Sequence, residues 1–195
     1  MNPKTAHFFR RFSLLFLFFM TSCGTPPTLI SKSAAIPAGV DLSGLWAVRI
    51  GAPTRRMEKG TGIRKELGHA RKMRPSRRSR TSDGVSAHVF LQYGTKLKIT
   101  QTDFGIFISY DRSVVDEFTF GENRIIKLGP IEALRASGWE DNSFVVETLD
   151  DSGTTLFESW FLEQGGSVLV RNIRISKGEE EKFFEEQRFD RQLKR

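Results

Sequence analysis

Cysteine is almost absent from this sequence: Cys23 is the only one in 195 residues. An intramolecular disulfide and a cysteine-based metal site are therefore excluded. Histidine is also scarce, and the two that follow Cys23, His69 and His88, are not at zinc-ligand spacing. No Gly-x-Ser-x-Gly nucleophile elbow occurs, and no apolar run reaches the roughly 20 residues that cross a bilayer. We therefore expect no metal, no cofactor and no catalytic residues.

The first 22 residues have the organisation of an export signal. Arg10 and Arg11 precede a short apolar run, residues 13–20, and the small residues Thr21 and Ser22 follow it. A positive segment, an apolar segment and a small-residue exit define a secretory signal peptide. We expect residues 1–22 to be this signal.

Cys23, placed directly after that exit, resembles the lipidated cysteine in the lipobox of bacterial lipoproteins. Met20 stands where the family pattern usually has leucine. The resemblance implies that Cys23 is acylated, and Gly24 in place of an aspartate implies an outer-membrane lipoprotein facing the periplasm. A plain secretory peptide, an uncleaved anchor and a reduced cytosolic protein are the alternatives. Residues 23–40, rich in Pro, Ser and Ala, are predicted to be a flexible tether.

The net charge of +7 is concentrated in one segment. Residues 52–85 contain eleven Lys or Arg and three acidic residues, a local net charge of +8, with few large apolar residues. We expect a mobile, disordered insertion there, which either contacts an anionic lipid or envelope polymer or has no partner. Nucleic acid is not expected, because the chain is exported and the segment lacks interleaved aromatic residues. The candidate contacts are Arg71, Lys72, Arg74, Arg77, Arg78 and Arg80.

Short β-type runs separated by turn residues dominate the rest of the chain. They cover residues 45–50, 96–101, 105–110, 115–120, 124–128, 132–140, 143–149, 154–162, 167–175 and 181–190. Runs at this spacing predict an all-β fold, an antiparallel meander of about 8–10 strands that closes as a barrel or a strongly curved sheet. Residues 41–195 would form this single β domain, with 52–85 inserted.

Gly44-Leu45-Trp46 on the first strand resembles the Gly-x-Trp motif of lipocalin-type barrels. In that family a late arginine packs over the tryptophan, and Arg191, which shares a face with Phe189, is preferred to Arg188 for this role. The run from Phe144 to Arg171 also resembles a group of uncharacterised bacterial lipoproteins with a lipocalin-like β domain. The resemblances imply a lipocalin-like barrel over residues 41–50 and 96–191. An ordinary core tryptophan is the alternative for Trp46.

Three charged residues on the later strands form a second candidate site. If the intervening turns have four residues, Glu147 and Glu158 are diagonal neighbours on one face, at a separation that an inverting glycosidase could use. The same turns place Arg171 opposite Glu158, which favours a structural ion pair or a ligand-binding pair over catalysis.

The sequence therefore favours a non-catalytic envelope lipoprotein whose β domain binds an apolar or amphipathic small molecule or a partner. The alternative is a structural or assembly lipoprotein with a filled barrel and no ligand. A hydrolase that uses Glu147 and Glu158 is the third possibility.

Overall fold

A computed structural model describes residues 28–49, 56–58 and 87–193. The predicted signal peptide, Cys23 and the six candidate basic contacts from Arg71 to Arg80 lie outside these residues. In the described part the fold is all-β, with two single-turn 3-10 segments, η1 (Ala87–Phe90) and η2 (Gln164–Gly166).

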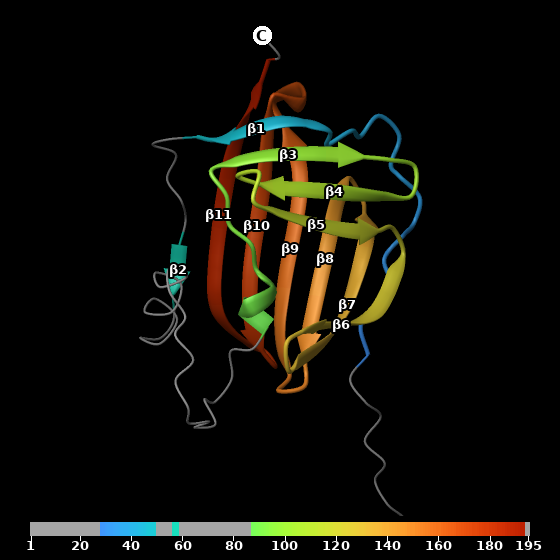
Figure 1. The fold of residues 1–195 in the computed structure, drawn as a ribbon, viewed down its shortest axis with the longest axis vertical. Helices are drawn as coiled ribbons and strands as arrows, with labels where there is room; N and C mark the ends of the chain where they lie inside the picture. Colours follow the sequence, from blue (N-terminus) through green and yellow to red (C-terminus); the bar gives the residue numbers. More distant parts are fainter. Residues whose placement is uncertain (1–27, 50–55, 59–86, 194–195) are drawn as a thin grey trace, which may run out of the picture.

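Ten antiparallel strands form one nearly closed, barrel-like sheet (Figure 1). In sheet order they are β5 (Val114–Thr119), β4 (Gly105–Tyr110), β3 (Lys96–Gln101), β1 (Gly44–Val48), β11 (Glu180–Gln192), β10 (Val168–Lys177), β9 (Thr154–Glu163), β8 (Ser143–Asp150), β7 (Ile131–Glu140) and β6 (Glu122–Leu128). A further short strand, β2 (Arg56–Glu58), pairs with β11. The predicted all-β meander is confirmed, and β2 was not predicted.

The two edge strands, β5 and β6, define the seam of the barrel. They leave a shared turn and diverge, and no ladder joins them in the described chain (Figure 1). Near the turn the seam is held by the Ser137 hydroxyl, which donates to the Thr119 carbonyl oxygen over 2.8 Å. The barrel is thus closed at one end of the seam and open toward the other.

Side chains of alternate residues fill the inside of the barrel, as expected for strands with one buried face. One apolar cluster includes Trp46, Trp139, Phe144 and Phe189. A second cluster, at the η1 end, packs Ala87, Phe90 and Leu91 against β9, β10 and β11. The Asp150 carboxylate anchors η1 by accepting the Ala87 backbone N–H at 2.9 Å. The side chains of η1 and Leu91 therefore fill this end of the barrel.

Residues 28–40 pack on the barrel, whereas the sequence predicted a flexible tether over residues 23–40. Ser33 exchanges two backbone hydrogen bonds with Trp139, on the edge of β7 that β6 leaves free. Lys32 is buried and contacts the carboxylates of Glu140 at 2.6 Å and Glu147 at 3.0 Å. Composition alone suggested a linker, because these contacts come from a distant part of the chain.

Candidate functional site

Trp46 is buried in the first apolar cluster and packs against Arg191. The two residues are direct partners across β1 and β11, and the Arg191 guanidinium lies 4.2 Å from the centre of the Trp46 ring. Arg191 also donates to the backbone carbonyl oxygens of Ser43 and Gly166, each at 2.8 Å. This is the arrangement that the Gly-x-Trp resemblance implied.

Gly44 makes this approach possible. A Cβ atom at this position would lie 2.9 Å from Nη1 of Arg191 and 3.3 Å from Nε1 of Trp46, and φ is +154°. A side chain would therefore displace the Arg191 guanidinium, crowd the Trp46 ring and strain the backbone. Glycine is needed two residues before Trp46 because the Arg191 guanidinium occupies the space that a Cβ atom of residue 44 would take.

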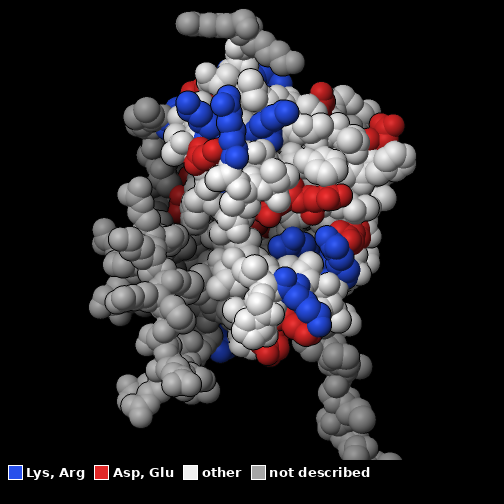
Figure 2. All heavy atoms as spheres, in the orientation of Figure 1, with Lys and Arg blue, Asp and Glu red and all other residues white. Residues whose placement is uncertain are grey.

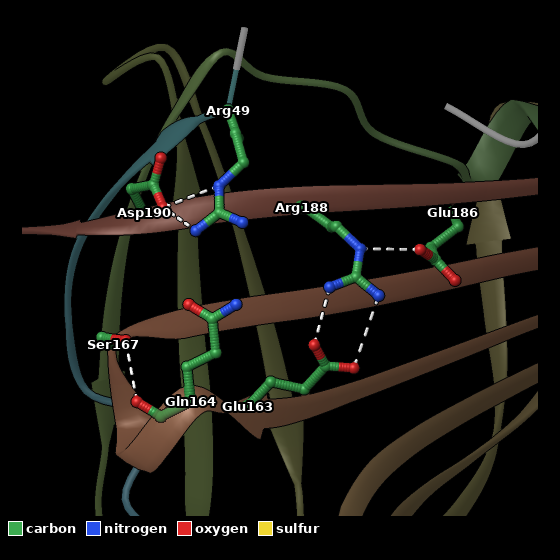
Figure 3. A network of polar contacts seen from close by, with 7 residues as sticks. All are labelled: Arg49, Glu163, Gln164, Ser167, Glu186, Arg188 and Asp190. Carbon is green, nitrogen blue, oxygen red and sulfur yellow. Dashed lines mark hydrogen bonds and ion pairs between the residues drawn. The ribbon is translucent and has the colours of Figure 1, made fainter. Parts of the chain in front are cut away.

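Arg188, the other arginine considered for this role, lies on the outer surface (Figure 3). It binds Glu186 on its own strand at 2.8 Å and Glu163 at 2.6 Å. Arg49 binds Asp190 beside it, with Nε to Oδ1 at 2.9 Å. Solvent screens these ion pairs, so they contribute little to stability, and they link the strand ends near Trp46.

A buried ion pair between Arg171 and Glu158 lies inside the barrel. The Arg171 side chain is 0% exposed, and its Nε donates to Glu158 Oε2 at 2.9 Å. Its Nη1 donates to the Gln92 carbonyl oxygen at 2.8 Å and to Gln187 Oε1 at 3.2 Å. Burial is the largest single influence on the pKa of Arg171 and lowers it, but the charge and hydrogen bond of Glu158, together with Tyr110 and Tyr93, raise the pKa overall. Arg171 therefore stays charged in the core.

The partners meet through a register that differs from the predicted one. Glu158 is opposite Ile173, and Arg171 is opposite Trp160, a shift of two residues. Because side chains alternate with period two, the shift keeps both residues on the inner face. The long Arg171 side chain then reaches Glu158 along the diagonal. The shift arises because Glu163 belongs to β9, so that the turn begins at Gln164.

Glu147 is not part of this cluster. Glu158 is opposite Val146, one residue from the predicted position, so Glu147 faces the outer surface, where it binds Lys32. The cause is Asp150, which extends β8 by one residue and accepts the Thr154 N–H at 2.9 Å. The carboxylate pair considered for a glycosidase therefore does not exist, because its members lie on opposite faces of the sheet.

Aromatic rings surround the ion pair and fill the middle of the barrel. The Arg171 guanidinium lies 4.5 Å from the ring centre of Trp160, 5.6 Å from that of Tyr110 and 5.9 Å from that of Tyr93. Trp160 and Tyr110 are among the largest fully buried side chains. Any ligand therefore has to bind away from this central layer.

A groove of about 380 Å³ lies where the seam opens. Asp116 on β5 forms one wall, Arg124 and Ile126 on β6 with Arg135 on β7 form the other, and η1 contributes Phe90. We call this the seam groove. Its volume is at the lower end of the range for small-molecule sites. It combines apolar surface with charged groups, and on the face shown in Figure 2 one of the two groups of basic side chains lies over β6.

Two arginines lie side by side on one wall of this groove. Arg124 and Arg135 are directly opposite partners in the β6–β7 ladder, an arrangement that costs free energy because like charges repel. Arg124 binds Glu122 at 2.7 Å. Among the described residues no carboxylate lies within ion-pair distance of Arg135, whose guanidinium lies 5.3 Å from the Phe118 ring and 5.8 Å from the Phe90 ring. Burial is the main cause that lowers the pKa of Arg135.

Asp116 lines the same groove, and the pKa of its carboxyl group is raised. Burial, with a further contribution from the charge of Glu158, raises the pKa of its carboxyl group to about 6, against the opposing effect of Arg135 and Arg171. Asp116 therefore gains or loses its charge in a physiological pH interval. Neither Asp116 nor Arg135 was selected from the sequence, although each shares an alternating face with buried aromatic residues.

This pKa leads to a stability prediction. The ordinary value is 3.8, so the folded state holds the Asp116 proton more tightly than the unfolded state does. The resulting stabilisation is full below about pH 4 and is lost as the pH rises through about 6. We expect Asp116→Asn to flatten this decline in urea unfolding experiments between pH 4 and 7.5. Identical profiles for the variant and the wild type would contradict the shifted pKa.

A larger groove, about 530 Å³, lies on the outer side of β1, β3 and β4. Its cations, Lys96, Lys98 and Arg112, are exposed, and solvent screens such charges. The carboxylate of Asp111, the acidic residue of this groove, accepts hydrogen bonds from the backbone N–H groups of Thr95 and Lys96. We regard the seam groove as the better candidate because Arg135 is partly buried there and has no carboxylate within ion-pair distance in the described chain.

Two further findings concern metals and membranes. In residues 28–49, 56–58 and 87–193, no three His, Cys, Asp or Glu side chains gather as metal ligands. The helical segments in this part of the chain are too short to cross a membrane.

Comparisons with protein-family models, with curated proteins and with solved structures found no match. The functional argument therefore depends on the chain's own residues.

Proposed function

We propose that this chain is an envelope lipoprotein, anchored through acylated Cys23, whose barrel binds an amphipathic small molecule without catalysis. The export-signal pattern before Cys23 supports the location. The observation that carries the binding function is the seam groove, where Arg135 lines an apolar surface with no carboxylate partner in the described chain. Groups that fix the orientation of a ligand within an apolar wall are typical of small-molecule sites.

A filled scaffold without a ligand is the second candidate. The buried Arg171, Trp160 and Tyr110 support it, because they occupy the middle of the barrel where a lipocalin-type ligand would lie. The two functions differ at the seam groove: a scaffold needs no ligand there. Native mass spectrometry of the protein extracted from its own membrane distinguishes them. A retained small molecule supports binding, and a protein that carries only its acyl chains supports the scaffold.

The anchor has its own test. We expect Cys23→Ala to move the protein from the membrane fraction to the soluble fraction, because the acyl chains supply the membrane affinity. Fractionation followed by immunoblotting measures this, and intact-mass analysis of the wild type measures the added chains. Ser22→Ala, which keeps a small residue before the cysteine, serves as the control. Membrane retention of the Cys23→Ala protein would refute the anchor.

A further inference from the structure

We infer that the seam groove binds the head group of a single-chain amphipath that carries one carboxylate, phosphate or sulfonate-type anion, with Arg135 as the main contact. This inference deepens the proposed binding function and rests on it. The anion would lie between Arg135 and Arg124, and the chain would lie along the apolar wall.

The first argument is charge. The groove has Arg124, Arg135 and Lys127 in its lining and a single acid, Asp116. Glu122 and Glu132 engage Arg124 and Lys127, whereas Arg135 has no such partner in the described chain. An anion bound to Arg135 would relieve the repulsion between the two opposed arginines and would replace the water lost on burial of the guanidinium.

The second argument is the apolar surface beside these charges. Ile126 and Leu128 alternate with the outward Lys127 and follow Arg124 on the same face of β6, so apolar surface continues directly from the cation. Phe90 of η1 and Phe118 of β5 flank the guanidinium. A small inorganic anion would leave this surface without a partner, and a neutral lipid would leave Arg135, which donates only a long hydrogen bond of 3.5 Å to the Thr148 hydroxyl, without an anionic one. An amphipathic anion satisfies both.

The volume limits the ligand further. About 380 Å³ accommodates one head group with part of a single chain, and not a lipid with several chains. The central layer of Arg171, Trp160 and Tyr110 closes the way to the other end of the barrel. The rest of the chain would therefore leave the groove through the open seam.

The experiment uses the full chain with Cys23→Ala, which avoids detergent, and isothermal titration calorimetry below the micelle concentration of each probe. The probes are decanesulfonate, decyl phosphate, decanol and inorganic phosphate. We expect decanesulfonate and decyl phosphate to bind at least tenfold more tightly than decanol or inorganic phosphate. Inorganic phosphate binding as tightly as decyl phosphate would indicate a free-anion site and overturn the inference.

Variants locate the site. Arg135→Gln should weaken decanesulfonate binding at least tenfold and leave decanol binding within twofold. Arg174→Gln is the matched control, because it removes one positive charge from the outer face of β10 and should change neither. Equal losses in both variants would show a nonspecific charge effect and would refute the site. Circular dichroism checks that each variant is folded.

Asp116 provides a further readout. Its carboxylate competes with the ligand for Arg135, and Glu158 and Arg171 are the other charged groups that influence it. Decanesulfonate keeps its charge, so its binding should tighten as the pH falls from 7.5 to 5. Asp116→Asn should remove most of this pH dependence, and a pH dependence that is unchanged in this variant would contradict the competition between Asp116 and the ligand.

The failures are distinguishable. If decanol and decanesulfonate bind equally and Arg135→Gln affects neither, the groove binds apolar ligands, the proposed function stands and this inference fails. If no amphipath binds at all, the proposed binding function fails as well, and the filled scaffold replaces it.

Discussion

Replacing Arg171 with methionine is expected to lower the free energy of unfolding by about 3–5 kcal/mol, because it leaves the Glu158 carboxylate charged and unpaired in the core. Glu158 is only 7% exposed in its side chain, so water cannot replace the guanidinium. The Gln92 carbonyl oxygen and the Gln187 amide oxygen also lose a donor. Urea denaturation monitored by tryptophan fluorescence measures the change.

Two further variants make this result specific. Combining Arg171→Met with Glu158→Leu should recover part of the loss, because no unpaired charge remains. Arg174→Met, three residues along the same strand, removes an arginine that binds Glu181 at the surface and should cost roughly 0–1 kcal/mol. A double variant less stable than Arg171→Met alone, or equal losses at residues 171 and 174, would contradict a buried pair.

Trp46→Ala is expected to cost about 3–5 kcal/mol, the usual range for deleting a buried tryptophan. Trp46 is 1% exposed, and the deletion also removes the surface on which the Arg191 guanidinium lies. Thermal and urea unfolding should both show the loss.

Leu45→Ala is the matched control for that prediction. Leu45 neighbours Trp46 on β1 but points outward and is 40% exposed, so its removal should cost less than about 1 kcal/mol. If the two substitutions cost the same, the buried packing of Trp46 against Arg191 does not contribute to stability in the way described.

The strands were predictable because their signals are local. Alternating apolar residues bounded by turn residues placed β3 and β4 at their observed bounds and the other strands of the barrel within about two residues. The turns between them were harder. Asp150 extends β8 because its carboxylate binds the backbone of the following turn, and the composition of the turn does not reveal this. One residue there decided that Glu147 faces outward.

The site was less predictable than the fold because it joins distant strands. Period-two alternation places Arg135 on the inner face of β7 with Trp139, and Asp116 with Phe118 on β5. A charged residue within an apolar inner row was the available signal. The inward-facing residues of β5 and β7 meet at the open seam because β5 and β6 diverge there. No local sequence pattern predicts where the two strands diverge.

The packing of residues 28–40 also determines how the barrel would stand on a membrane. Thr28 follows Cys23 by five residues, and a chain covers at most about 3.6 Å per residue, so the described part begins within about 18 Å of the proposed anchor. The described chain starts beside β6, where the Asn123 amide holds the Leu29 carbonyl oxygen (Figure 1). If Cys23 is acylated as proposed, this short connection would restrict the orientation of the protein and would keep its seam side close to the leaflet. A single-chain amphipath could then pass between membrane and protein without crossing bulk water.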